Sequence, residues 1–286
     1  MKFKKHIKQA AVVIGAVLLS IPSQAAVIDV LWVGGSTSYN ANITELANEA
    51  ATFDPNSDGN NTWNLTLWDN SVMPTPDFSA YDVLVIGSYL TGSFNMGQTP
   101  DGVLANRAQI ENARGSRTLI TGQDADWHDL NNRPDQDDGP KGFLINAVNW
   151  AASGTGLGVV AMPDQINSAG WWMDPESFLR NELMGNVNYF NTNGVFLGAG
   201  QETFPINEGL SSAGLSNWNT SSHVIFDDID GYVGINFEGP NSTGRAITIV
   251  TEGQEDGGTT VNASNPSATL LIGLGITGLF MRRKRN

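Results

Sequence analysis

Short apolar runs that end in glycine alternate with segments of helical period over residues 27–162. Val27 to Val33 is one such run, closed by Gly34 and Gly35, and it is typical of a strand buried on both faces. Alternation predicts a strand at 63–68, further apolar runs predict strands at 81–87, 117–121 and 157–162, and helical spacing predicts helices at 43–53, 102–114 and 142–152. Strands that alternate with helices indicate an α/β fold with a mostly parallel sheet and helices on both faces.

The pattern is less regular beyond residue 162. A helix is predicted at 176–184, and strands at 195–197, 224–226, 232–236 and 245–250, the last of which suits a core strand. Residues 252–264 are rich in Gly, Thr, Asn, Ser and acidic residues without an apolar period, which predicts a flexible linker. The α/β domain is therefore expected to span residues 27–251.

The first 26 residues have the three parts of a secretion signal. A basic region to Lys8 precedes an apolar region from Ala10 to Ile21, which is too short for a permanent membrane span. Small residues follow, so signal peptidase is expected to cleave after Ala25 or Ala26. An uncleaved anchor is the alternative, and the short apolar region counts against it.

The last 22 residues, 265–286, combine a short motif, an apolar run from Thr269 to Met281 and a basic cluster that begins at Arg282. Ala-Thr-Leu-Leu at 268–271 and the spaced glycines of this tail resemble the PEP-CTERM sorting signal. Asn265, Pro266 and Ser267 stand where that family usually has Pro-Glu-Pro. The resemblance implies an apolar sorting helix, transient inner-membrane insertion, processing by an exosortase near the motif, and delivery to the cell surface or extracellular matrix. A simple weak membrane anchor is the alternative.

Charge and cysteine content limit the chemistry of the domain. The chain has 286 residues and a formal net charge of −14, but residues 1–26 and 265–286 hold eight of its 15 basic residues and no acid. The part between them keeps 7 basic residues against 29 acidic ones, which repels nucleic acid and anionic lipid and favours solubility outside the cell. The chain contains no cysteine, so thiol nucleophiles and thiolate metal sites are excluded.

The order of the predicted elements resembles the flavodoxin-like fold of the class I glutamine amidotransferase superfamily and its ThuA-like relatives. The strongest local piece is Phe204 to Leu210, which contains a Pro-Ile-x-x-Gly-Leu turn and is followed by Trp218 and His223. Amidotransferases of this family place a nucleophilic cysteine in the turn after the third core strand. Gly122, Gln123 and Asp124 occupy that turn here, so amidotransfer chemistry is not implied.

The turn at 121–129 concentrates groups that carry chemistry. It follows a predicted core strand at the carboxyl end, where open α/β sheets bind ligands. Asp124 or Asp126 with His128 would form an acid–base pair or a metal site, and His223 would complete it in space. In the alternative interpretation the carboxylates shape the loop and His128 is a surface residue.

A second polar loop resembles half of a calcium-binding loop. Asp54, Asn56, Asp58 and Asn60 alternate around Gly59, which would bring their oxygens onto one Ca²⁺ ion, although Leu65 stands at position 12 in place of an acid. An ordinary Asn/Asp/Gly turn is the alternative. Asp135 to Gly139 matches less well.

Eight tryptophans are many for this length. Trp171 and Trp172 lie in a predicted loop, where exposed indoles would stack on a matrix exopolysaccharide, and burial against the sheet is the alternative. Three functions follow from the sequence: an exported, non-catalytic surface or matrix protein with a binding or scaffold domain, an exported hydrolase of glycans or amides that uses the Asp/His residues, and a calcium-stabilised carbohydrate-binding protein. The first is our leading hypothesis.

Overall fold

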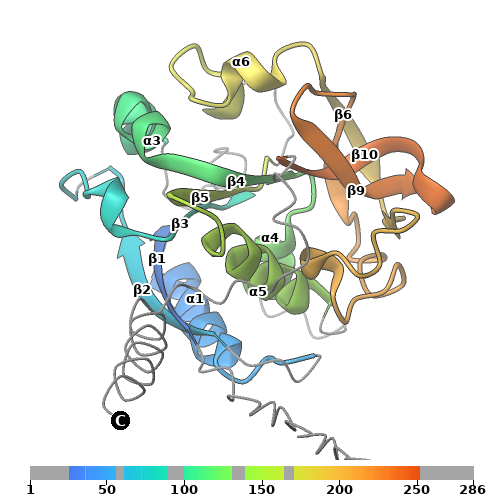
Figure 1. Cartoon of the computed structure of the whole chain (residues 1–286), viewed down its shortest axis with the longest axis horizontal. Coiled ribbons are helices and arrows are strands. Elements are labelled where there is room, and N and C mark those ends of the chain that lie inside the picture. The colour runs from blue at the N-terminus through green and yellow to red at the C-terminus, as the bar shows by residue number, and fades with distance from the viewer. Residues whose placement is uncertain are drawn as a thin grey trace, which may run out of the picture.

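The computed structural model describes residues 26–35, 37–55, 61–71, 73–88, 100–130, 139–163 and 171–251. They form an α/β domain around a mostly parallel, mixed sheet of ten strands, flanked by helices (Figure 1). The strands are β1 (Val27–Val33), β2 (Thr62–Trp68), β3 (Val83–Ile86), β4 (Arg114–Thr121), β5 (Leu157–Ala161), β6 (Val187–Thr192), β7 (Phe196–Leu197), β8 (Ser222–Phe226), β9 (Tyr232–Gly239) and β10 (Thr243–Thr251). The α-helices are α1 (Thr37–Ala50), α2 (Asp101–Ala105), α3 (Arg107–Ala113), α4 (Ala125–Leu130), α5 (Gly139–Ala152) and α6 (Arg180–Leu183).

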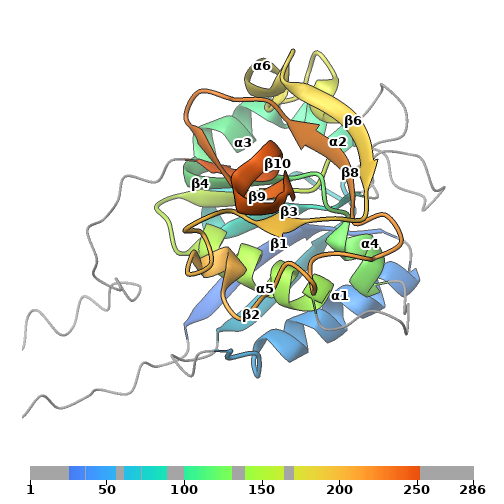
Figure 2. The ribbon, with the colours of Figure 1, turned by 90° about the vertical axis from the view of Figure 1, so that its right-hand side faces the viewer.

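The first five strands are parallel and lie in the order β2-β1-β3-β5-β4. The first three positions match a flavodoxin-like sheet, whose order is 2-1-3-4-5, and the last two strands are exchanged. The connections from β1 to β2 and from β4 to β5 run toward the β2 edge of the sheet, whereas the connection from β3 to β4 runs away from that edge. Right-handed crossovers therefore put α1 and α5 on one face and α2 and α3 on the other (Figure 2).

Each central strand contributes to two cores, because successive side chains point to opposite faces. In β1, Val30 and Trp32 pack with α1 and α5, whereas Leu31 and Val33 pack with α2 and α3. This is why the four residues from Val30 to Val33 are apolar without alternation. The sheet is thus buried on both sides, as parallel sheets are.

The carboxyl-terminal part of the chain extends the sheet with antiparallel pairs. β10 pairs with β4 through Thr248 to Val250 and with β8 at Ala246. β8 in turn pairs with β6, and β9 pairs with β10 and with β7. β10 passes from β4 to β8 along its length, and the backbone N–H of His223, near the start of β8, bonds the carbonyl oxygen of Gly122, just beyond the end of β4.

Most predicted elements are present, with four differences. The segment predicted as helix 102–114 is divided into α2 and α3 at Asn106, and the helix predicted at 176–184 is reduced to α6. The turn predicted at 121–129 contains a helix, α4, whose buried face includes Asp126 and His128 and so has no apolar period. The edge strand β6 was not predicted, because its side chains are half-buried or exposed and do not alternate.

The predicted leader up to Ala25, the linker and the sorting tail with Asn265, Pro266 and Ser267 lie outside the described residues. Ala26 is described, and its carbonyl oxygen accepts a hydrogen bond of 2.9 Å from the backbone N–H of Thr62. Within the described ranges, no helix has both the length and the apolar character needed to cross a bilayer.

Candidate functional site

The site begins where β4 ends. Gly122 follows Thr121, and its carbonyl oxygen accepts a hydrogen bond of 2.9 Å from the backbone N–H of His223, at the start of β8. A Cβ atom on Gly122 would lie 1.8 Å from the carbonyl oxygen of Val224, so only glycine allows β8 to approach this closely. This approach brings the next polar side chain of the turn, Asp124, next to His223.

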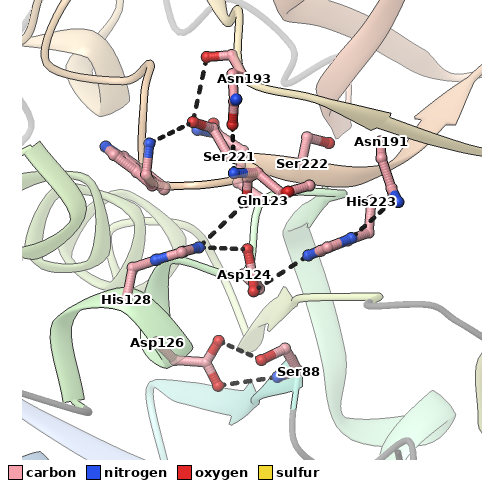
Figure 3. A network of polar contacts seen from close by, with 12 residues as sticks. Ser88, Gln123, Asp124, Asp126, His128, Asn191, Asn193, Ser221, Ser222 and His223 are labelled. Atoms are coloured by element: carbon pink, nitrogen blue, oxygen red, sulfur yellow. Dashed lines mark hydrogen bonds and ion pairs between the residues drawn. The ribbon is translucent and has the colours of Figure 1, made fainter. Parts of the chain in front are cut away.

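Asp124 lies between two imidazoles (Figure 3). Its Oδ1 atom is 3.2 Å from Nε2 of His128, one turn later in α4, and its Oδ2 atom is 3.5 Å from Nε2 of His223. Asp124 and His128 are each 2% exposed, whereas the side chain of His223 is 15% exposed. We call these three residues the His–Asp–His cluster. The cluster is buried and approaches the surface at His223.

The two histidines decide the ionisation of Asp124. Burial favours the neutral carboxyl, but the hydrogen bonds and positive charge of His128 and His223 outweigh it and hold the pKa of Asp124 below its usual value of 3.8. At neutral pH the cluster therefore contains a carboxylate rather than a carboxylic acid.

The hydrogen-bond partners fix the orientation of both rings. Nε2 of His128 faces two acceptors, Asp124 and the carbonyl oxygen of Thr220 at 3.1 Å, so this nitrogen carries a proton. The ring also packs against Trp218, with 5.6 Å between the ring centroids. Nδ1 of His223 is 2.8 Å from Oδ1 of Asn191, on the edge strand β6. The cluster therefore connects β4 and α4 with β6 and β8.

The loop that supplies the Thr220 carbonyl has an unusual backbone. Asn217, Asn219 and Thr220 have φ angles of 66°, 59° and 89°. Positive φ is uncommon for a β-branched residue such as Thr220. Each residue held in this region lowers the stability of the fold by about 1–3 kcal/mol. Asn193 holds this conformation, because its side-chain Oδ1 accepts a hydrogen bond from the backbone N–H of Thr220. Strain of this kind is concentrated at functional sites.

Asp126, the other carboxylate of the turn, points away from the histidines. Its Oδ1 atom accepts a hydrogen bond from Ser88 Oγ at 2.7 Å, and its Oδ2 atom accepts bonds from the Ser88 backbone N–H and from the Tyr39 hydroxyl, both at 2.9 Å. Gly87 leaves room for this carboxylate, because a Cβ atom there would lie 2.5 Å from Oδ2. Burial raises the pKa of Asp126 to about 6, the bonds from Ser88 and Tyr39 counteract the rise, and the charge of Asp124 adds to it.

The structure thus brings together three of the four predicted site residues, Asp124, His128 and His223, and gives Asp126 a separate set of partners. Four further members of the network are not predicted from the sequence: Tyr39, Ser88, Asn191 and Thr220. One of them had a signal: Ser88 directly follows a predicted buried strand, at the edge where α/β sheets gather polar groups. The alternative in which His128 is a surface residue is wrong.

The turn from Phe204 to Leu210 packs against α5. Ile206 and Glu208 offer their carbonyl oxygens to Nδ2 of Asn146 in α5, at 3.2 Å and 2.8 Å. Gly209 has a φ angle of 71°, which glycine adopts without strain. The turn therefore anchors the segment that leads to Trp218 on the helical face of the sheet.

The predicted metal and sugar-binding residues have different outcomes. Within the described residues, no group of three or more His, Cys, Asp or Glu side chains is arranged to hold a metal ion. Of the predicted calcium ligands, Asp54 is described, and Asn56, Asp58 and Asn60 lie outside the described residues. Trp171 and Trp172 are fully buried, so the interpretation as exposed stacking platforms is wrong and burial against the sheet is correct.

Comparison with known proteins does not assign the chain to a group. No protein-family model, no curated protein and no solved structure matches it.

Proposed function

We propose that the chain is an exported, non-catalytic cell-surface or extracellular-matrix protein whose α/β domain serves as a binding or scaffold unit. One observation supports the non-catalytic role most directly. Both oxygens of Asp126 accept hydrogen bonds from Ser88 and Tyr39, and the oxygens of Asp124 lie 3.2 Å and 3.5 Å from the imidazoles of His128 and His223 as ion pairs, Oδ1 without a hydrogen bond from another described residue. These carboxylates are engaged in holding the fold rather than presented to a substrate.

The contacts of the two carboxylates join elements that are distant in the sequence. Asp124 links the end of β4 with β8 through His223, and Asn191 extends the link to β6. Asp126 links α4 with the end of β3 and with α1. A domain fixed in this way at the carboxyl edge of its sheet suits a scaffold, because its loops are presented on a rigid base.

The terminal segments supply the proposed address. Signal peptidase would release the leader, and an exosortase-type enzyme would process the tail at Asn265 to Ser267 after transient membrane insertion. Cleavage after Ala25 fits the structure better than cleavage after Ala26, because it keeps the Ala26 carbonyl that pairs with Thr62. The partner at the surface would be an exopolysaccharide, and nucleic acid is excluded by the acidity of the domain.

Cell fractionation followed by mass spectrometry of both termini tests this address. We expect the mature chain in the envelope or medium, with an amino terminus at Ala26 and without the basic cluster from Arg282 to Arg285. Recovery of both intact termini from the soluble cell interior would overturn the proposal.

A hydrolase is the second candidate, and the convergence of Asp124, His128 and His223 at the carboxyl end of β4 favours it. A carboxylate that orients an imidazole is a common arrangement for acid–base catalysis, and the strained Thr220 lies beside it. Turnover of model glycosides, esters and amides would support this candidate if a His223→Asn variant abolished it without loss of the fold. Equal turnover by wild type and variant would dispose of it.

We also propose a distant relationship to the ThuA-like and class I amidotransferase folds. The parallel order β2-β1-β3 and the position of the polar turn after β4 support it, and the exchange of β4 and β5 is a departure. The absence of a cysteine nucleophile separates the chain from the catalytic members of that superfamily.

A further inference from the structure

One margin of the sheet ends in a strand without charge. Strand β6 pairs with β8 on one side, and within the described residues no strand pairs with its other side. Figure 1 shows β6 at the end of the molecule opposite to β2, the other edge strand. Native edge strands are commonly protected from pairing by lysine, proline or an inward-pointing charge, and β6 has none of the three, although the chain has 29 acidic residues.

Exposed apolar side chains gather at the same edge. Five large apolar side chains of the described residues are exposed, and three of them, Met184, Tyr189 and Phe190, lie in β6 or three residues before it. Tyr189 is 48% exposed and lies opposite Val224, on the same face of the sheet. Phe190 is 43% exposed and follows Tyr189 on the other face. Apolar surface therefore flanks the free edge of β6 on both faces.

The hydrogen-bond pattern shows which backbone groups of β6 point outward. Asp227 lies opposite Asn186 in the register of β6 on β8, and its backbone N–H donates to the carbonyl oxygen of Asn186 at 2.9 Å. In an antiparallel ladder, bonded pairs alternate with unbonded pairs. Asn188 is therefore bonded to β8, whereas the backbone N–H and C=O groups of Val187 and Tyr189 are directed to the free edge. These groups can bond a further strand.

A second copy of the same strand fits this edge. Two copies of β6 pair in antiparallel orientation when a two-fold axis runs perpendicular to the sheet. With the axis at Tyr189, this residue lies opposite Tyr189 of the second copy, and the two exchange backbone hydrogen bonds through the groups that point outward. Their rings then lie side by side on one face, where an aromatic cross-strand pair is stabilising. On the other face, Asn188 lies opposite Phe190 of the second copy.

The charges beside β6 favour this register. Nδ2 of Asn188 donates a hydrogen bond of 2.8 Å to Asp227, and the ring centroid of Phe190 lies 5.9 Å from the guanidinium of Arg245. With Asn188 opposite Phe190 of the second copy, Asp227 of each copy therefore comes close to Arg245 of the other. Arg245 also meets Glu238 through Nε, at 3.5 Å, and its guanidinium has further donors for Asp227. Self-pairing thus brings opposite charges together on both sides of the axis, which offsets the repulsion between two acidic domains.

We propose that two copies of the chain join edge to edge through β6, so that their sheets become one continuous sheet across a two-fold axis at Tyr189. The register shift of β6 between Tyr189 and Thr192 bends the end of the strand and keeps the contact short. The dimer is therefore weak, with a Kd on the order of 100 µM. The inference deepens the proposed scaffold function by naming its partner, and it rests on the address of the protein only for where the dimer forms.

Sedimentation equilibrium of the purified full-length chain tests the proposal over about 5–500 µM, a range that brackets this Kd. We expect a monomer–dimer equilibrium. Tyr189→Pro removes an outward N–H without breaking the ladder to β8 and should raise the Kd at least about tenfold. Tyr189→Lys, which places two positive charges at the axis, should do the same. Met73→Lys is the matched control, because it adds the same charge at an exposed apolar residue outside β6 and should leave the Kd unchanged.

A charge exchange tests the register. Arg245→Glu should weaken the dimer, because it brings two acidic side chains together near each end of the contact. Combining Arg245→Glu with Asp227→Arg restores opposite charges across the axis and should recover the affinity. An equally weak dimer in the single and the double variant would refute the register centred on Tyr189.

Three results would overturn the proposal as a whole. The first is a monomer at every concentration, and the second is a dimer that Tyr189→Pro and Tyr189→Lys leave intact. The third is an open series of larger oligomers, which would indicate head-to-tail pairing of β6 with β2 in place of a closed dimer. Far-UV circular dichroism of each variant checks that the fold is retained. Because association is measured with the purified chain, a failure here is separate from a failure of the proposed export, which the analysis of the termini reports.

Discussion

Replacing Asp126 with asparagine removes a titrating group from the interior and keeps its shape. In the folded chain the pKa of Asp126 is about 6, against 3.8 for an unperturbed aspartate, chiefly because the carboxyl is buried. Between these two values the folded state binds a proton that the unfolded state has released. The free energy of unfolding contributed by this group must therefore rise as the pH falls through 6, and the gain is complete below 3.8.

The two pKa values give the size of the effect. Acidification from about pH 7.5 to about pH 5 should raise the free energy of unfolding by about 1.4 kcal/mol through Asp126 alone. Asp126→Asn cannot bind this proton, so the wild type should gain about 1.4 kcal/mol more than the variant over this interval. At about pH 7.5 the free energies of unfolding of the two proteins should differ less than at about pH 5. The amide oxygen of the asparagine still accepts hydrogen bonds from the backbone N–H of Ser88 and the hydroxyl of Tyr39.

Urea denaturation followed by circular dichroism at the two pH values measures this difference. Other acidic residues also titrate on acidification, and Asp230→Asn controls for them, because it removes one negative charge from an exposed position. The control should keep the pH dependence of the wild type. If Asp126→Asn and the wild type gained the same free energy, the assigned burial and partners of Asp126 would be wrong.

Three further predictions concern the same end of the sheet and the core. Asp124→Ala should lower the free energy of unfolding by about 3 kcal/mol at neutral pH, because it leaves two imidazoles without their carboxylate. Since the pKa of Asp124 is lowered in the fold, this difference should persist above about pH 4 and shrink below it, and a difference that does not change with pH would contradict the pairing. Gly122→Ala should lower the free energy of unfolding, measured by urea denaturation, by at least about 3 kcal/mol, because its Cβ would meet the carbonyl oxygen of Val224. Gly185→Ala is the control: its Cβ would meet no atom, and its φ of 89° should cost about 1 kcal/mol. Equal costs would refute the close approach of β8. Trp172→Ala should lower the free energy of unfolding by about 3–5 kcal/mol in urea denaturation, because its indole is fully buried, and a cost below about 1 kcal/mol would contradict that burial.

The central parallel strands could be predicted from the sequence because their signal is local. A strand segment buried on both faces is apolar at successive positions, so the segments 30–33, 83–86 and 157–161 can be recognised as buried strands without knowledge of their neighbours. The turn after β4 was also identified as the place of the polar cluster, since the carboxyl edge of an α/β sheet gathers such groups. Three of its four proposed residues do lie together.

The antiparallel extension could not be predicted in the same way. β6 is an edge strand with exposed and half-buried side chains, so it has neither an apolar run nor an alternating pattern. The helix α4 was interpreted as a turn because its buried positions include Asp126 and His128. Their burial depends on partners that lie 38 to 92 residues away, Ser88, Tyr39 and Thr220 among them.

By itself the sequence determined the alternation of strands and helices, the acidity of the domain, the absence of thiol chemistry and the location of the polar turn. Only the tertiary structure decided that β4 and β5 exchange places, that His223 reaches Asp124 while Asp126 turns away, and that Trp171 and Trp172 are buried. The physical reason is the range of the interactions. Burial of an element is indicated by the hydrophobic pattern of residues adjacent in the sequence. Strand order and the partners of a buried charge depend on contacts between distant segments, which meet only when the whole sheet has formed.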